Sequence, residues 1–343
     1  MTTVYATHSR YTEHDLPGHP ENADRIRAVW HGLHESGLDA RMRPLEVQAL
    51  DTDAVLAVHT ADYLDMLRRI SDTTRTIHLD PDTYAGPDAL TIARLSAGGV
   101  VAATDAVLSG AADNGLAATR PPGHHAMPDH AMGFCLLGNV AIATRYAQRR
   151  YGIDRILIVD YDVHHGNGTE AMFYDDPSVL YISTHQYPFY PGTGAASDTG
   201  TGRGQGYTIN IPLSAGSGDS NYAMVFDQIV WPAAERFDPQ LILVSVGFDA
   251  YWADPLAAMR LTLDGYSRLA EQVIGMARRC CAGKIVFALE GGYDMDALRY
   301  GAANVARLLL GEPPVDPPGI RPSPRPEPDI EALIARLKQL HAL

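Results

Sequence analysis

The sequence predicts an α/β protein in which a central, mostly parallel sheet is covered by helices on both faces. Between Thr2 and Leu310, short runs rich in β-branched residues alternate with longer patterns typical of helices. Several short runs are apolar at nearly every position, such as LILVSV over Leu241–Val246. A strand that is apolar on both sides is buried on both faces, which is the usual state of a strand in a parallel sheet.

Each expected element follows from this alternation of patterns. We expect strands at Thr3–Thr7, Gly115–Thr119, Arg155–Asp160, Val179–Thr184, Tyr207–Pro212, Leu241–Val246 and Lys284–Leu289. We expect helices at Glu21–Ser36, Pro87–Leu108, Gly138–Arg150, Ser220–Arg236, Leu263–Arg279 and Asp294–Leu310. After residue 311 the composition changes: residues 312–328 are Pro-rich and predict an extended segment, and Asp329–His341 predicts a short amphipathic helix. The expected organisation is therefore a domain over 1–311 and an appendage over 312–343.

The unusual polar residues follow the expected strands. They form five clusters, at Arg120–His125, Asp160–His165, Ser183–His185, Gly247–Asp249 and Glu290–Tyr293. In open α/β sheets the carboxyl ends of the strands form the edge at which ligands bind. The sequence therefore predicts that these clusters meet in one site.

The bulk composition restricts the function. The chain of 343 residues has 46% hydrophobic and 20% charged residues, as in an ordinary globular protein. The net charge is −14 and no cluster of basic residues is present, so we expect no direct nucleic acid binding. Acidity suits a cationic substrate, although solubility alone is the simpler explanation.

The same composition bears on the cellular compartment. The apolar runs are too short to cross a bilayer, so we expect no membrane partner. The first residues do not read as a secretory signal, and the three cysteines do not form a disulfide framework. A cytoplasmic location is the expectation, and a homo-oligomer is compatible with the sequence.

The segment Val159–Gly168, VDYDVHHGNG, predicts a metal site. In an extended chain, residues two apart face the same way, so Asp160, Asp162 and His164 can point to one side. Asp249 also follows a buried strand and is the third candidate ligand. Two carboxylates and one imidazole form an open three-ligand site that suits zinc, without excluding Fe(II), Co(II) or Mn(II). The alternative is that each residue merely caps a strand end.

Two further segments carry candidate catalytic groups. His124 and His125 follow a stiff Pro-Pro-Gly turn and could both be metal ligands, or one general base and one electrostatic partner. Asp160 could orient one imidazole and Asn167 the other. The two glycines before Tyr293 let the chain turn sharply, so that its hydroxyl could donate to an oxyanion. Taken alone, each segment also has a non-catalytic explanation. The histidines could be an incidental pair in a loop, and Tyr293 could simply pack beside a Gly-rich turn.

Together these residues resemble the histone deacetylase superfamily. The motifs RPPGHHA, GFC, DYDVHHGNGT, PGTG, GFDA followed by Asp254-Pro255, and EGGY occur in family order from about His19 to Leu310. The spellings look most like the class II branch and the bacterial branch of deacetylase-like and acetylpolyamine amidohydrolases. The resemblance implies an arginase/deacetylase-like three-layer fold.

The resemblance also implies residue roles. Asp162, His164 and Asp249 would bind zinc. His125 would be the general base that activates the attacking water, and His124, bonded to Asp160, would give electrostatic support. Tyr293 would stabilise the oxyanion. The substrate tunnel would be lined by Phe134, Tyr190, Gly133 and Leu256, with Tyr190 at a position where the family often has Phe.

Two cation sites are implied as well. A potassium ion would lie at the site formed by Asp160, Asp162, His164, Ser183 and Thr184. An outer cation site would map to Phe173, Asp176, Val179 and Tyr207.

The implied activity is zinc-dependent removal of an acetyl group from acetyl-lysine in a protein or peptide. The first alternative is an acetylpolyamine amidohydrolase, whose entrance would need acidic gate residues. The candidates for such a gate are the loops Glu13–Asp15 and Asp80–Asp82, although Asp82 also suits an ordinary solvated turn. Three readings from other classes remain. They are a non-catalytic protein that binds an acyl ligand, an arginase-type hydrolase, and a structural subunit whose tail docks a partner.

Overall fold

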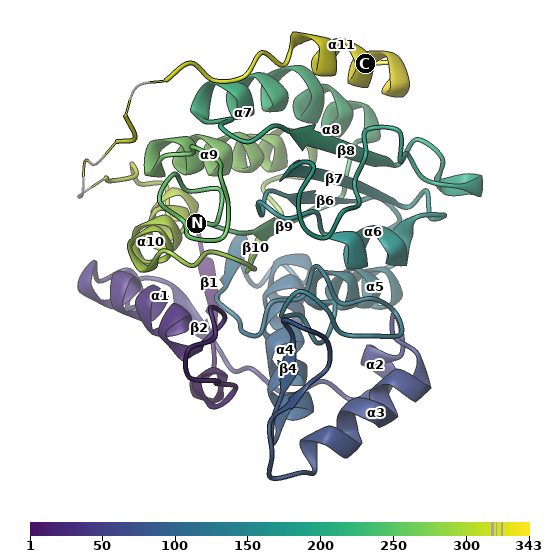
Figure 1. Ribbon diagram of the computed structural model, residues 1–343, viewed down its shortest axis with the longest axis vertical. Coiled ribbons are helices and arrows are strands. Elements are labelled where there is room, and N and C mark those ends of the chain that lie inside the picture. The colour runs from purple at the N-terminus through teal and green to yellow at the C-terminus, as the bar shows by residue number, and fades with distance from the viewer. Residues whose placement is uncertain (317–318, 320, 324) are drawn as a thin grey trace.

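The computed structural model describes residues 1–316, 319, 321–323 and 325–343. Its centre is an eight-stranded sheet in the order β2-β1-β5-β10-β9-β6-β7-β8, and every pairing in it is parallel (Figure 1). These strands are β1 (Thr3–Ala6), β2 (Arg43–Leu45), β5 (Asn114–Ala117), β6 (Ile156–Asp160), β7 (Val179–Gln186), β8 (Thr208–Leu213), β9 (Leu241–Val246) and β10 (Ile285–Leu289). A separate antiparallel pair joins β3 (Ile77–His78) and β4 (Tyr84–Ala85).

Helices cover both faces of the sheet and complete the predicted three layers. One layer contains α1 (Ala23–Glu35), α7 (Asp219–Val225), α8 (Trp231–Phe237), α9 (Leu263–Cys280) and α10 (Met295–Leu309). The other contains α3 (Ala61–Ser71), α4 (Ala89–Leu108), α5 (Asn139–Tyr151) and α6 (Asn167–Phe173). The short α2 (Thr52–Val55) packs on α5, and α11 (Glu331–His341) lies beside α7 and α8 (Figure 1).

The seven predicted strands are all present, and their bounds differ from the prediction by two residues at most. The sheet is closely buried because both faces of each central strand are apolar; every residue of β6, β9 and β10 is buried. Five of the six helices predicted in the domain are present as single helices, and so is the C-terminal one, which begins at Glu331 and not at Asp329. The predicted start of the first helix at Glu21 is wrong, because Asn22 caps α1 and its side chain accepts from the Asp24 N–H.

The helix predicted over Ser220–Arg236 is not one regular α-helix. It runs as α7, then a π-helical turn at Phe226–Val230, then α8. Pro232 lies in the first turn of α8. Because proline has no N–H to donate and its ring crowds the preceding turn, the backbone widens just before it.

One expectation about apolar length is corrected by α4. This helix of 20 residues is long and apolar enough to cross a membrane by length and composition alone, which the inspection of apolar runs overlooked. It packs against β1, β5, β10 and α5, and 78% of its most apolar window is buried inside the protein. Such burial is typical of a core helix, so its apolar residues are explained by packing against the sheet on one side and α5 on another.

The C-terminal segment packs onto the domain through Glu327. The Glu327 carboxylate accepts hydrogen bonds from the backbone N–H groups of Gly218, Ser220 and Asn221, at 2.9, 3.1 and 2.8 Å. These groups open α7, which has no side-chain cap of its own. Four residues of the expected extended segment, Pro317, Pro318, Ile320 and Pro324, lie outside the described residues.

Replacing Glu327 with alanine is expected to lower the free energy of unfolding by about 1–2 kcal/mol, the usual cost of losing a carboxylate cap. The variant should also be cut faster within 312–328 by a protease of broad specificity. Urea unfolding of the intact chain measures the first effect. Glu331→Ala, in the exposed first turn of α11, is the control and should change stability by less than about 0.5 kcal/mol. Equal stability of all three proteins would contradict the capping role.

Candidate active site

Five neighbouring strands supply the site from their carboxyl ends. In sheet order these are β5, β10, β9, β6 and β7. The loops that follow them carry, respectively, the His124-His125 pair, Tyr293, Asp249, the Asp162–His164 segment and Tyr190. Parallel strands bring their carboxyl ends to one edge, so residues far apart in sequence converge there, as predicted.

The three predicted metal ligands form a tight, buried group. His164 Nδ1 lies 3.3 Å from Asp162 Oδ1 and 3.2 Å from Asp249 Oδ2. Backbone N–H groups fix the two carboxylates: Gly291 donates to Asp162 Oδ2 at 2.7 Å, and Val163 donates to Asp249 Oδ1 at 2.9 Å. The ligand atoms of all three residues are therefore oriented toward one point by bonds to two different loops.

The electrostatics of this group fit a divalent cation. Two carboxylates and one imidazole, all buried, leave an excess of negative charge that a protein interior tolerates only with a partner. Burial disfavours the charged imidazole, yet the bonds to Asp162 and Asp249 raise the pKa of His164 to about 10. The two carboxylates thus stabilise a positive charge at this point, either a proton on His164 or a bound cation. A zinc ion with O,O,N ligands would replace that proton, because a histidine that binds a metal is neutral.

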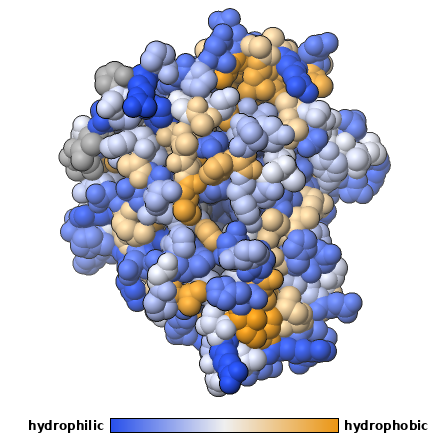
Figure 2. Space-filling view, in the orientation of Figure 1, coloured by the Kyte–Doolittle hydropathy of each residue, from blue (hydrophilic) through white to orange (hydrophobic). Residues whose placement is uncertain are grey.

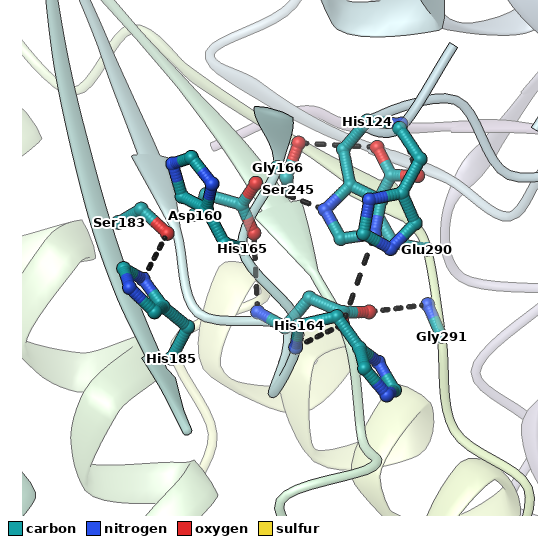
Figure 3. A network of polar contacts seen from close by, with 12 residues as sticks. His124, Asp160, His164, His165, Gly166, Ser183, His185, Ser245, Glu290 and Gly291 are labelled. Atoms are coloured by element: carbon teal, nitrogen blue, oxygen red, sulfur yellow. Dashed lines mark hydrogen bonds and ion pairs between the residues drawn. The ribbon is translucent and has the colours of Figure 1, made fainter. Parts of the chain in front are cut away.

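A second buried group, formed by His124, Cys135 and Glu290, also brings potential ligand atoms together. Here the chain itself satisfies the carboxylate. Glu290 accepts from the backbone N–H groups of Gly123 and His124 at 2.6 and 3.1 Å, and from the Ser245 hydroxyl at 3.1 Å (Figure 3). Burial raises the pKa of Glu290 to about 7. We therefore interpret Glu290 as a clamp on the histidine loop and assign no ion to this group.

The two histidines have the two partners expected from the sequence. His124 Nδ1 lies 3.1 Å from Asp160 Oδ2, and the Tyr181 hydroxyl donates to the same oxygen at 3.0 Å. Burial disfavours the His124 imidazolium, but the carboxylates of Asp162 and Asp160 outweigh it and raise its pKa to about 10. His124 is therefore a positive charge next to the metal group.

His125 is held in the opposite protonation state. Its Nδ1 lies 2.8 Å from Oδ1 of Asn167, which is the first residue of α6. Burial, together with the positive charges of His124 and His164, lowers the pKa of His125 well below its ordinary value. With Nδ1–H donating to the amide oxygen, Nε2 is left as an acceptor. This is the state that a general base needs at neutral pH.

Replacing Asn167 with aspartate is expected to raise the pKa of His125, because a carboxylate stabilises the imidazolium more strongly than a neutral amide does. The protonated form is inactive as a base, so activity is lost as the pH falls through this pKa. The acidic limb of the kcat/KM profile should therefore move to higher pH. Profiles of both proteins between pH 5 and 9 test this, and an unmoved limb would contradict the assigned hydrogen bond.

These groups lie at the base of a pocket of about 180 Å³. All four predicted tunnel residues, Phe134, Tyr190, Gly133 and Leu256, line it. Gly133 has φ +55°, and a Cβ there would lie 2.3 Å from the His125 ring, so only glycine fits between wall and base. The face shown in Figure 2 is largely hydrophilic, with a hollow near its centre bordered by apolar side chains.

The sequence reasoning missed one aromatic wall of the pocket. The Phe189 ring stacks on His164, with ring centroids 5.6 Å apart and an interplanar angle of 18°. Its neighbour Tyr190 meets His125 edge-on at 5.3 Å. The run YPFYPG offered two adjacent aromatics, and only the one that the resemblance pointed to was assigned.

Of the two acidic loops proposed as a gate, only one reaches the pocket. Asp82 lines it, and burial together with Asp80 raises the pKa of Asp82 above its ordinary value. In the other loop, Glu13 pairs with Arg10 and Asp15 accepts from the Ala23 N–H at the start of α1. The Glu13–Asp15 loop therefore serves the fold in this structure.

The backbone that carries Tyr293 is held by a buried ionic cluster that the sequence reasoning also missed. Arg25 donates to the carbonyls of Gly292 at 2.7 Å and Glu290 at 2.6 Å, and its guanidinium lies 4.9 Å from the Tyr293 ring centre. Glu21 pairs with Arg25 and with Arg120, which precedes the histidine loop. Arg25 of α1 and Glu21 just before this helix thus brace two catalytic loops through paired charges, as buried charges require.

The residues of the predicted potassium site lie together at the ends of β6 and β7. Asp160 and Ser183 are paired across β6 and β7, and all five residues of the predicted site are buried. The Ser183 hydroxyl lies 2.9 Å from His185 Nδ1 (Figure 3). Of the outer site, the carbonyl of Phe173 accepts from the Asp176 N–H, and the Asp176 carboxylate pairs with Arg145. Occupation of either site stays a prediction.

Comparisons with known proteins identify the family and the fold. Residues 19–309 match the histone deacetylase domain family. The chain is 44% identical over 295 residues to the histone deacetylase-like amidohydrolase of Pseudomonas aeruginosa, covering 86% of this chain and 77% of that protein. It is 40% identical over 315 residues to a probable deacetylase of Archaeoglobus fulgidus, covering 91% and 87%. The crystal structure of the HDA15 HD domain superposes with a TM-score of 0.87 at 39% identity, covering 92% and 91%.

Proposed function

Because the chain belongs to the histone deacetylase family, which is a family of hydrolases, we propose a specific activity for it. The proposed activity is zinc-dependent removal of the acetyl group from acetyl-lysine in a protein or peptide. The observation that carries this proposal is the pairing of a neutral His125 with Tyr293 and the metal group at the base of one aromatic pocket. A base, an oxyanion donor and a Lewis acid site within one narrow pocket are the parts that amide hydrolysis requires.

In the proposed mechanism each residue acts at a stated atom. Asp162, His164 and Asp249 would hold a zinc ion, which would supply Lewis acidity at this end of the pocket. His125 Nε2 accepts a proton from the attacking water as the C–O bond forms. It returns that proton to the amine nitrogen as the C–N bond breaks, which leaves acetate and the free amine. The Tyr293 hydroxyl donates to the oxyanion. Burial, opposed by the Arg25 charge, keeps the pKa of Tyr293 well above its ordinary value, so the hydroxyl stays a donor.

The pocket mouth favours a peptide over a polyamine. Leu256 is apolar, and among the lining residues of the described chain Asp82 is the one acidic side chain. A single carboxylate at the rim suits the backbone N–H groups beside an acetyl-lysine, whereas a polycation would gain from several carboxylates along the channel. The aromatic walls of Phe134, Phe189 and Tyr190 suit the long methylene chain of lysine.

The remaining proposals concern the ions and the surroundings. We propose zinc as the working metal, with Fe(II) or Co(II) as substitutes, and potassium in a structural role at the ends of β6 and β7. The proposed location is the cytoplasm, and homo-oligomers remain compatible with the fold. These statements rest on the chemistry of the residues and on composition.

The deciding experiment is steady-state hydrolysis of an acetyl-lysine peptide and of N8-acetylspermidine by the zinc-loaded enzyme. The His125→Ala protein is the blank. We expect the larger kcat/KM for the peptide. A preference for the polyamine would turn attention to Asp82 and Asp80 as a gate. If neither compound is hydrolysed, the proposed activity is wrong, and a binding role on the same fold gains weight.

A further inference from the structure

Asp254 lies outside the metal group and has no role in the mechanism described so far, although it is buried beside the site. It follows β9 by a short loop, and its relative exposure is 6%. Its Oδ2 accepts from the backbone N–H groups of Tyr293 at 2.7 Å and Asp294 at 3.1 Å, and its Oδ1 accepts from Leu256 N–H at 2.9 Å. One side chain therefore holds the backbone of the oxyanion donor and of a tunnel wall.

We propose that Asp254 is a positioning residue that fixes Tyr293 in its donor position and couples it to the wall at Leu256. Two of the three bonds, to Tyr293 and Asp294, join the loop after β9 to the loop after β10, and the third, to Leu256, lies within the loop after β9. They continue the backbone bond from the Phe248 N–H to the Gly291 carbonyl, which joins the same two loops nearer the strands. The two oxygens of Asp254 together accept three backbone N–H groups, so one buried side chain fixes the backbone of both loops.

The Tyr293 segment is clamped from two sides by this arrangement. Asp254 binds the N–H of Tyr293, and Arg25 binds the carbonyl of the preceding Gly292. Gly292 has φ +116°, a conformation that side-chain-bearing residues rarely adopt, so the peptide between the two clamps is set by glycine. With both ends of this peptide bonded, the backbone from which the Tyr293 side chain projects is fixed. A catalytic group misplaced by about 1 Å can lose roughly 10²-fold in rate.

A purely structural role would look different from this coupling. Asp219 offers the comparison, since its carboxylate also holds another loop, accepting from the Thr262 N–H at 2.9 Å and the Thr262 hydroxyl at 2.7 Å. Asp219 has no bond to the Tyr293 loop among the described contacts. Asp219→Asn should therefore lower stability without changing kcat of the folded protein, and it serves as the matched control for Asp254→Asn.

The test is a double-mutant cycle, and it rests on the proposed function. In the wild-type background, Asp254→Asn should lower kcat about tenfold with a smaller change in KM, as for loss of a residue that orients a catalytic group. In the Tyr293→Phe background, which has no hydroxyl left to position, the same change should alter kcat by less than about twofold. Equal fractional losses in both backgrounds, or none in the wild type, would overturn the proposal.

A crystal structure of Asp254→Asn provides a readout that does not depend on turnover. We expect the Tyr293 hydroxyl to be displaced or split between conformers, and unmoved in Asp219→Asn. An ordered Tyr293 in its original place would overturn the positioning role. If the wild-type protein hydrolyses no acetamide, the proposed function fails on that result alone, and the structure of the variant still decides whether Asp254 fixes Tyr293.

Discussion

Replacing Asp249 with asparagine is expected to remove tightly bound zinc and to lower kcat/KM by about three orders of magnitude. The substitution preserves size and leaves an amide oxygen that can still accept from the Val163 N–H. It removes one of the two negative charges facing His164 Nδ1, so the group no longer carries the excess charge that favours a divalent cation. A metal ion contributes several kcal/mol to such a reaction, and each 1.36 kcal/mol is tenfold in rate.

Metal content after dialysis and kcat/KM across a zinc titration measure the two effects separately. Excess zinc should restore part of the activity, because the other two ligands remain. The control is Asp105→Asn, whose carboxylate bonds the hydroxyls of Tyr146 and Tyr151 away from the pocket. That variant should keep its metal and its activity. Full metal content and full activity in Asp249→Asn would show that the cation is bound elsewhere.

The fold and the convergence of the site could be predicted from the sequence because both depend on local pattern. Strands such as Leu241–Val246 are apolar at nearly every position, and this pattern indicates a parallel sheet covered on both faces. Once that is known, polar residues directly after the strands must meet at one edge. The pattern offered Asp160 and Asn167 as partners of the two imidazoles without saying which partner belongs to which, and the resemblance assigned Asp160 to His124. The structure pairs His124 with Asp160 and His125 with Asn167.

The elements that were missed are those whose signal is weak or non-local. Helix α3 begins at the Thr60 cap and buries Tyr63, Leu64 and Leu67, a spacing that could have identified it. The three-residue strand β2 has no such pattern, since two of its residues are exposed and it pairs only along one edge of β1. Short edge strands depend on their neighbour for their existence, which a sequence window does not contain.

The residues that brace the site were beyond sequence reasoning for a different reason. Arg25 is separated from the loop that it holds by more than 260 positions, and its guanidinium is fully buried. From the sequence pattern of its helix, Arg25 would be interpreted as an ordinary charged residue on a solvent-exposed face. Asp254 stood in a recognised motif, but two of its three N–H partners, those of Tyr293 and Asp294, belong to a different loop. Only tertiary structure reveals which charged residues are structural partners of catalytic ones.

Replacing Tyr293 with phenylalanine is expected to lower kcat by about two to three orders of magnitude, the usual cost of one oxyanion donor, while KM changes little. The hydroxyl stabilises charge that develops only in the transition state, so its loss appears in kcat. The ring contacts with Phe134 and Arg25 are retained by phenylalanine, which isolates the effect of the hydroxyl.

Tyr190→Phe is the matched control, since it removes a hydroxyl from another tyrosine of the same pocket. Tyr190 meets His125 through its ring and forms part of the wall, so its variant should lose less than about fivefold, mainly in KM. Steady-state kinetics of both variants on one acetyl-lysine peptide, at equal zinc loading, make the comparison. If the two tyrosines cost the same, the oxyanion is stabilised by the metal group alone. In that case the clamp of Asp254 and Arg25 on the Tyr293 loop would serve the shape of the tunnel and not the chemical step.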